Sequence, residues 1–147
     1  MATTTATITL SSSDIADNAL SLSNTMTMTT AGTTTGITET TGLARKKIAS
    51  ATEVDLLTVS NLEVTAAKSA KVYIKNTSTA TDKYALIGIG EATGSPTYIG
   101  RLYGGDWMLF PWDANETGGA AHANNEDVTI KMNDATETVI EYMVFFE

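Results

Sequence analysis

The residues that most often carry out chemistry in proteins are scarce in this chain, which has one histidine, His122, and no cysteine. Without cysteine there can be no disulfide, no thiolate nucleophile and no zinc–thiolate site. A single histidine also excludes metal sites built from several imidazoles. His122 lies in the small-residue segment Gly118–Ala123, which offers no serine for it to activate. We therefore expect His122 to be an exposed loop residue and the protein not to be an enzyme.

Oxygen ligands gather in two short segments, Asp113–Glu116 and Asn124–Asp127. Calcium prefers such ligands, but neither segment has the alternating spacing and central glycine of a helix–loop–helix calcium site. Nothing in the sequence fixes the separation that two carboxylates need to act as an acid–base pair on a glycoside. We expect solvated loops here, with no metal ion and no cofactor. A cation held by one of these loops is the alternative.

The three glycines within Gly88–Gly94 come close to the spacing of a dinucleotide-binding turn. The third glycine is one position late, and a turn containing Pro96 follows where that motif needs a helix. Within a strand, glycine allows a β-bulge or a close approach of another part of the chain. We expect that structural role for these glycines.

Apolar and polar residues alternate through most of the C-terminal half, and turn residues separate the alternating stretches. Such alternation predicts β-strands with one buried face. Helix-favouring residues occur in Ala44–Ala51 and Leu62–Ala70, but nearby Thr, Ser and Val argue against a long helix, and only Asp14–Ala19 is interpreted as a single helical turn. The expected strands are Lys71–Lys75, Tyr84–Gly90, Tyr98–Tyr103, Trp107–Trp112, Asp127–Met132 and Glu137–Phe146, with weaker candidates at Ala6–Leu10, Ser21–Thr30, Leu43–Ser50 and Glu53–Val59.

The chain has 147 residues, of which 42% are hydrophobic, enough for one domain with a real core. We expect an all-β fold, an antiparallel β-sandwich that is jelly-roll-like or related, with its core in residues 70–147. Residues 1–69 form a Thr-rich N-terminal arm or extra strands, packed on the main domain or swapped with it. Within them, Thr29–Gly42 has low complexity and almost no charge, and is either a mobile loop or an arm that orders against a neighbour.

The formal net charge of −8 has the wrong sign for general binding to nucleic acid. Residues 1–83 hold seven basic and seven acidic groups, whereas residues 84–147 hold two basic and ten acidic groups. This division suits a subunit that docks on a larger body, although ordinary solubilising charge explains it as well. The sequence has no stretch of about 20 apolar residues and no secretory leader, so we expect neither a membrane span nor secretion.

Concentrated positive charge occurs at Arg45, Lys46 and Lys47. These side chains could contact an acidic partner surface. The alternative, which we favour, is that they line the edge of a sheet, where charged side chains discourage unwanted strand pairing.

The stretch Trp107–Trp112 is apolar on both sides. Alternation places Trp107, Leu109 and Pro111 on one face, and Met108, Phe110 and Trp112 on the other. Such a strand is either buried in the core, which we favour, or has one face covered by another subunit. The candidate partner-interface residues are therefore Arg45, Lys46, Lys47, Trp107, Phe110 and Trp112.

Four stretches of the C-terminal half follow one another in a distinctive order: Lys71–Asn76, Ile99–Trp112, Asp127–Lys131 and Thr138–Phe145. This pattern of strands resembles small β-sandwich virion proteins of tailed bacteriophages, notably marine and cyanobacterial ones. The resemblance covers residues 70–147 and carries no catalytic residues. It implies a structural part of the virus particle, such as a capsid decoration (cement) protein or a tail-associated subunit.

The expected function is that of a non-enzymatic decoration subunit, made in the host cytoplasm and bound to the outer surface of the capsid. Its expected partners are the major capsid protein and further copies of itself, as a trimer or dimer. The alternative is a tail, neck or fibre subunit that recognises a host surface. In that case exposed aromatic rings beside acidic and amide side chains, at Trp112, Asp113 and Asn115, would stack on sugars.

Overall fold

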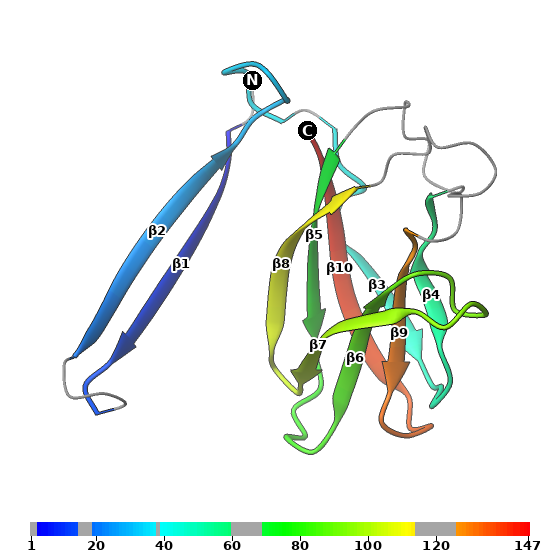
Figure 1. The fold of residues 1–147 in the computed structure, drawn as a ribbon. Coiled ribbons are helices and arrows are strands. Elements are labelled where there is room, and N and C mark those ends of the chain that lie inside the picture. The colour runs from blue at the N-terminus through cyan, green and yellow to red at the C-terminus, as the bar shows by residue number, and fades with distance from the viewer. Residues whose placement is uncertain (1–2, 15–18, 38, 60–68, 114–125) are drawn as a thin grey trace. The chain divides into compact units, whose positions relative to one another are not determined.

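A computed structural model describes residues 3–14, 19–37, 39–59, 69–113 and 126–147. Within these residues the protein has ten β-strands and no α-helix, so the prediction of an all-β fold is confirmed (Figure 1). The chain divides into two compact units, residues 1–39 with Glu147, and residues 40–146. The strands are β1 (Thr4–Ser12), β2 (Leu20–Met28), β3 (Ala44–Ile48), β4 (Val54–Leu57), β5 (Ser69–Asn76), β6 (Tyr84–Ile89), β7 (Thr97–Tyr103), β8 (Trp107–Asp113), β9 (Val128–Met132) and β10 (Thr138–Phe146).

The N-terminal unit is a two-stranded antiparallel ribbon made of β1 and β2. Nine residue pairs hold the strands in one register, from Thr4 opposite Met28 to Ser12 opposite Leu20. Threonine, which is β-branched and favours extended backbone, supplies much of both strands. The helical turn predicted at Asp14–Ala19 falls on residues 15–18, which lie outside the described part of the chain.

The second unit is a sandwich of two four-stranded antiparallel sheets, with strand orders β3-β10-β5-β8 and β4-β9-β6-β7. Reading inward from the ends of this unit, the strands pair as β3 with β10, β4 with β9, β5 with β8, and β6 with β7. Eight strands paired in this nested way and divided between two sheets have the jelly-roll topology. The predicted antiparallel sandwich is therefore confirmed.

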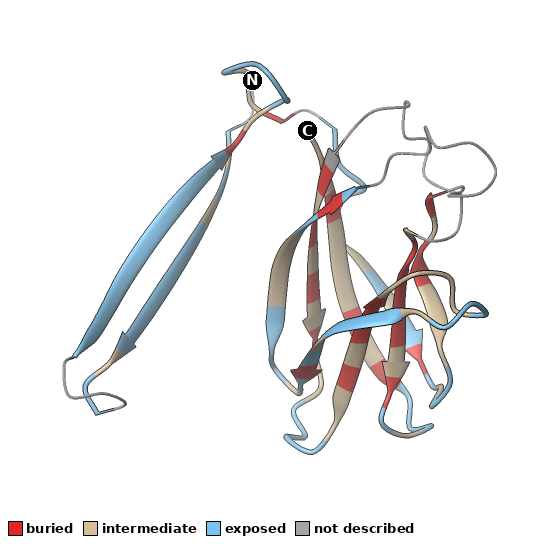
Figure 2. Cartoon of the chain, in the orientation of Figure 1, coloured by how far each residue is buried: buried red, intermediate tan, exposed pale blue. Residues whose placement is uncertain are grey.

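The core lies between the two sheets and is built from the inward-facing half of each alternating strand (Figure 2). Val72 and Ile74 of β5, Ile87 of β6, Ile130 of β9 and Ile140 of β10 are fully buried. This burial agrees with the prediction from alternation that the strands have one buried face. Burial of apolar area at this interface is the main source of stability for the fold.

The strands β3 and β4 belong to the two sheets of the sandwich, although they precede residue 70, where the sequence predicted the core to begin. The sandwich unit begins at Thr40, which is anchored to the last strand. The Thr40 hydroxyl donates to the carbonyl oxygen of Val144 at 2.7 Å, and the Val144 N–H donates to the Thr41 hydroxyl at 3.0 Å. The low-complexity segment predicted at residues 29–42 is thus shared between the two units.

Gly88 lies at a β-bulge, as predicted for the glycines of Gly88–Gly94. The register between β6 and β7 shifts between Ile87 and Gly88. A Cβ atom at position 88 would lie 2.8 Å from the Thr129 hydroxyl oxygen and 3.3 Å from Pro96 and Tyr98. Glycine is therefore required here by the close approach of neighbouring side chains.

Candidate interaction surfaces

The β1–β2 ribbon has two chemically different faces, because its register places like residues opposite each other. On one face, Thr5, Thr7, Thr9 and Ser11 lie opposite Thr27, Thr25, Ser23 and Ser21. The Thr7 and Thr25 hydroxyls form a hydrogen bond of 2.8 Å across the strands. We call these eight residues the hydroxyl ribbon face, which water can solvate fully.

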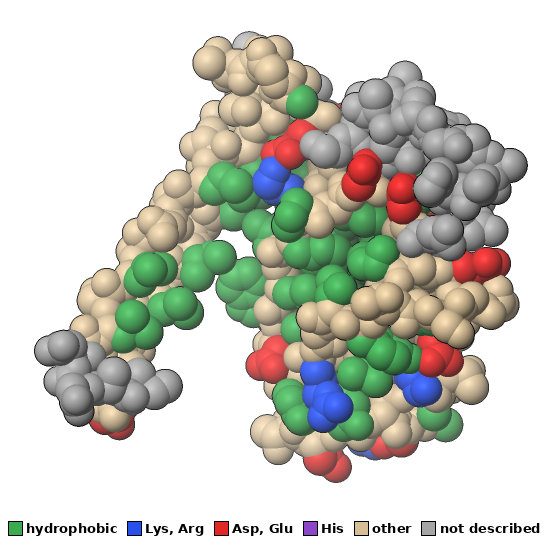
Figure 3. Space-filling view, viewed as in Figure 1, with side chains coloured by type: hydrophobic (Ala, Val, Ile, Leu, Met, Phe, Trp, Pro, Cys, Tyr) green, Lys and Arg blue, Asp and Glu red, His purple; other side chains and the backbone are tan. Residues whose placement is uncertain are grey.

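The opposite side, which we call the apolar ribbon face, carries hydrophobic side chains. Leu10 lies opposite Leu22, Ala6 opposite Met26, and Ile8 opposite Asn24. Five of the large side chains are between 40% and 50% exposed, namely Ile8, Leu10, Leu20, Leu22 and Met26. Figure 3 shows hydrophobic side chains in a row along the visible side of this ribbon. An isolated two-stranded ribbon is only marginally stable in water, so an uncovered apolar face of this length indicates a docking surface.

A second apolar surface lies on the outer side of the β3-β10-β5-β8 sheet. Tyr73 of β5 lies between Leu109 of β8 and Met143 of β10, and its ring centroid is 6.3 Å from that of Trp107. Trp107 is 49% exposed, and the other members are half-buried or exposed. We call this surface the sandwich face, and its residues are Tyr73, Trp107, Leu109, Pro111, Met143 and Phe145.

Charged groups on the same outer side lie at one end of the sandwich face. The Glu141 carboxylate accepts a hydrogen bond from Arg45 at 3.0 Å and one from the Tyr73 hydroxyl at 3.4 Å. Burial, followed by the nearby Glu141 charge, raises the pKa of Tyr73 above its usual value. The row across the three strands that contains Leu109, Tyr73 and Met143 is therefore predominantly apolar.

The structure places the predicted basic cluster on β3, at the edge of a sheet. Arg45 pairs with Glu141 at 2.9 Å and Lys47 pairs with Glu137 at 2.8 Å, and both basic side chains are more than two-thirds exposed. Lys46 points the other way and donates to the backbone carbonyl of Asp55 at 2.8 Å. This edge position agrees with the interpretation that these charges guard a free strand edge. A contact with a partner stays a prediction.

The three predicted aromatic contact residues lie in different environments. Trp107 is exposed, and Phe110 packs against the core from a half-buried position. Trp112 is only 4% exposed, and its indole N–H donates to the Glu126 carbonyl at 2.6 Å. Trp112 is therefore a core residue, and its predicted role as a surface contact or a sugar-stacking ring is wrong. Alternation correctly separated Trp107 from Trp112, but it did not tell which of them faces inward.

A hollow of about 410 Å³ lies between the edge strands β3 and β4 and is lined by Lys46, Asp55, Leu56 and Tyr142 among others. The Asp55 carboxylate accepts a hydrogen bond from the Ala92 N–H at 2.8 Å. No group of three or more His, Cys, Asp or Glu side chains suited to a metal ion occurs among the described residues. The candidate residues His122 and Asn115 lie outside the described part of the chain.

A polar cluster on the second sheet surrounds the Glu53 carboxylate. Tyr98 donates a hydrogen bond to the Glu53 carboxylate, and Lys131 donates a second at 3.2 Å. The bond from Tyr98, with a backbone bond and Lys131, lowers the pKa of Glu53 to about 2. Burial, followed by the bond to Glu53, raises the pKa of Tyr98 to about 12. The folded state therefore favours the charged form of Glu53.

We expect the Glu53→Gln variant to melt at a lower temperature than the wild type at neutral pH. A carboxylate whose pKa is lowered by folding stabilises the protein above its ordinary pKa of about 4.5, and this contribution is lost as the pH falls towards about 2. The difference in melting temperature should therefore shrink across that window, as measured by circular dichroism. Asp82→Asn, which changes an exposed loop carboxylate, is the control. A difference that stays constant with pH would contradict this assignment.

Comparisons with known proteins identify no family for this chain. No protein-family model matches it, and no curated protein sequence matches it. A solved chain described as "Bacillus endospore appendages form a novel family of disulfide-linked pili" has 16% sequence identity and a TM-score of 0.43. That alignment covers 71% of this chain and 85% of the other. In the described residues, no helix is long and apolar enough to cross a membrane.

Proposed function

We propose that this protein is a non-enzymatic structural subunit of a virus particle, a decoration protein that binds the outside of a capsid shell and stabilises the joints between capsid subunits. The observation that supports the proposal is the exposed apolar ribbon face, which indicates a protein that assembles through its surfaces. The sequence resemblance of residues 70–147 to phage virion proteins supports a virus particle as the assembly to which this subunit belongs. Jelly rolls occur in viral capsid and lectin domains, which supports the same class of function by analogy.

The mechanism would be passive adhesion. Burial of apolar surface contributes about 25 cal/mol for each Å² removed from water, so a modest contact becomes significant when it is repeated over a shell. The expected partner is the major capsid protein, with the subunit itself forming a small symmetric oligomer. In this proposal the protein resides on the outer surface of the virion.

The alternative function is recognition of a host surface glycan by a tail, neck or fibre subunit. Trp112 no longer supports it, because that ring is buried. Tyr98, Tyr103 and Trp107 are each at least 40% exposed, however, and exposed aromatic rings can stack on sugars. This second function therefore depends on those three rings.

Binding to undecorated capsids of tailed phages tests the proposal. We expect purified protein to bind at a fixed number of copies per shell and to raise the melting temperature of the shells. The Leu10→Gln/Leu22→Gln variant, altered on the apolar ribbon face, should bind at least tenfold more weakly, because a subunit that no longer forms an oligomer loses multivalent attachment to the shell. The matched control is Thr9→Ala/Ser23→Ala on the hydroxyl ribbon face. Binding to glycans or host cells, with no binding to capsids, would overturn the proposal in favour of the alternative.

A further inference from the structure

We propose that two copies of this chain exchange their N-terminal ribbons, so that the apolar ribbon face of each copy covers the sandwich face of the other. This inference deepens the proposed function and rests on it in one respect only, namely that the protein assembles through its surfaces. It names the occupant of both apolar surfaces as a second copy of the chain.

The composition of the ribbon favours an apolar partner. Neither β1 nor β2 contains a charged residue, so docking removes no charge of the ribbon from water. Its five large exposed side chains form an apolar strip, interrupted by Asn24 opposite Ile8. The hydroxyl ribbon face stays in contact with water when the apolar face is covered.

The sandwich face offers apolar side chains of the kind that this strip requires. It spans three neighbouring strands, β10, β5 and β8, and a two-stranded ribbon fits across it as a second layer. Lys71 lies in the row between Phe145 and Pro111, where its apolar stem can pack while its ammonium group reaches the rim. The charges of Arg45, Glu141 and Lys75 lie at one end of the face, where Lys75 is opposite both Glu141 and Trp107.

Docking face to face is favoured over addition of a strand to the β8 edge. β8 is the end strand of its sheet and contains Pro111, which has no N–H to donate to an added strand. At the other end of this sheet, β3 carries Arg45 and Lys47, which discourage pairing in the same way. We therefore expect the ribbon to contact the face of this sheet and not its edge strands.

The area that would be buried favours reciprocal exchange over contact between two ribbons. A nine-residue, two-stranded ribbon presents a face of about 300 Å², from a rise of about 3.4 Å per residue and a width of about 10 Å. Two ribbons that touch each other bury about 600 Å² in total, which is less than the roughly 1,000 Å² of a specific interface. Reciprocal exchange creates two such contacts and buries about 1,200 Å², which reaches that class.

The first test measures the oligomeric state of the full chain by analytical ultracentrifugation over a range of concentrations. We expect dimers, or oligomers built from them, for the wild type and for the control Thr9→Ala/Ser23→Ala. We expect weaker dimers for two variants, the ribbon variant Leu10→Gln/Leu22→Gln and the sandwich variant Trp107→Gln/Leu109→Gln. Each substituted side chain should weaken the affinity of the dimer by about tenfold or more. Circular dichroism confirms that each variant is folded.

Mixing the two variants provides the decisive result. Each variant alone lacks both contacts, but an equimolar mixture restores one of the two, so native mass spectrometry should detect a heterodimer. Dimers that persist in the sandwich variant would show contact between ribbons and overturn the proposal. A wild-type protein that stays monomeric at all concentrations would also overturn it.

Cysteine cross-linking gives a readout that does not depend on dissociation, because the chain has no cysteine of its own. We expect the Leu10→Cys/Leu109→Cys variant to form disulfide-linked dimers under oxidation. The single Leu10→Cys variant should form few. A disulfide confined to monomers would place the ribbon on its own sandwich and overturn the exchange. If the protein forms the dimer but does not bind capsids, this inference stands and the proposed function is refuted. If a monomer binds capsids, the proposed function stands and this inference is refuted.

Discussion

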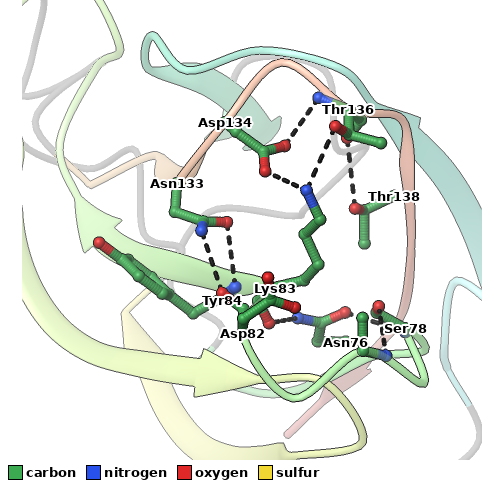
Figure 4. Close-up of polar contacts among 10 residues, drawn as sticks. Asn76, Ser78, Asp82, Lys83, Tyr84, Asn133, Asp134, Thr136 and Thr138 are labelled. Carbon is green, nitrogen blue, oxygen red and sulfur yellow. Dashed lines mark hydrogen bonds and ion pairs between the residues drawn. The ribbon is translucent and has the colours of Figure 1, made fainter.

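Asn76→Ala is expected to destabilise the sandwich by about 3 kcal/mol or more, because it leaves several polar groups in the interior without partners. Asn76 is fully buried at the end of β5 (Figure 4). Its side-chain amide donates to the carbonyl oxygens of Lys83 and Leu102, both at 3.2 Å, and its carbonyl oxygen accepts from the Ser78 N–H at 3.0 Å. One side chain thus connects the loop before β6 to the end of β7. Equilibrium unfolding in urea measures the loss.

Asn133→Ala is the matched control for this prediction. Asn133 also joins two loops through its amide, which accepts from the Tyr84 N–H at 3.2 Å and donates to the Asp82 carbonyl at 3.0 Å. Its side chain is exposed, so water can replace both bonds, and the expected loss is below about 1 kcal/mol. Equal losses for the two variants would show that burial does not determine the contribution of Asn76.

The sequence predicted the turn that follows Lys71–Lys75, but not the burial of Asn76 within it. A turn asparagine is ordinarily exposed, and its partners here come from positions 83 and 102. Those residues become neighbours only through the pairing of β5, β6 and β7 in two different sheets. Local turn chemistry is readable from adjacent residues, whereas this contact depends on the complete strand order.

The strands themselves were predictable because period two is a local property of the chain. All ten observed strands overlap a predicted one, including the weak candidates in the Thr-rich region. The chemistry of the ribbon was not predictable in the same way. The alternation of Thr and Met near residue 26 was visible, but the apolar face forms only when Leu10 lies opposite Leu22 and Ala6 opposite Met26. The apolar ribbon face depends on the register between β1 and β2, which the sequence of either strand alone does not determine.

The positions of the candidate contact residues were predicted in part, and their role in a contact stays a prediction. Arg45 and Lys47 lie on an edge strand, as favoured from the sequence, whereas the exposure of Trp107 contradicts the favoured interpretation that this strand is buried on both faces. Trp112 agrees with the favoured core interpretation, and only its place among the candidate contacts is wrong, since both sides of β8 are apolar and alternation alone cannot show which side meets the second sheet. Tyr73 and Met143 of the sandwich face were missed. Their outward direction in otherwise buried strands was the available signal.

Gly104→Ala is expected to cost about 3 kcal/mol, because the added methyl group collides with backbone and not with a movable side chain. A Cβ atom at position 104 would lie 2.3 Å from the carbonyl oxygen of Ala80 and 2.9 Å from that of Ser78. The turn between β7 and β8 would have to move, and with it the bond from the Gly105 N–H to the Asn76 carbonyl oxygen, which is 2.9 Å long.

Two other glycines separate this collision from other effects of substitution. Gly100→Ala, in the adjoining strand, meets no atom closer than 4.0 Å and should be tolerated within about 1 kcal/mol. Gly105→Ala has open space but a φ of +89°, so it should cost about 1 kcal/mol from backbone strain alone. If Gly104→Ala were no worse than Gly105→Ala, the close packing of this turn against the Ser78–Ala80 loop would be refuted.

The double variant Asn76→Ala/Gly104→Ala shows whether these two residues act as one structural unit. Both hold the β7–β8 turn against the same loop, so once one is altered the other has fewer native contacts left to lose. The combined loss of unfolding free energy should therefore be smaller than the sum of the single losses by about 0.5–3 kcal/mol. Because β8 begins at Trp107, directly after this turn, the same variants should also weaken dimerisation through the sandwich face. Strict additivity in urea unfolding would mean that the two residues stabilise the fold independently.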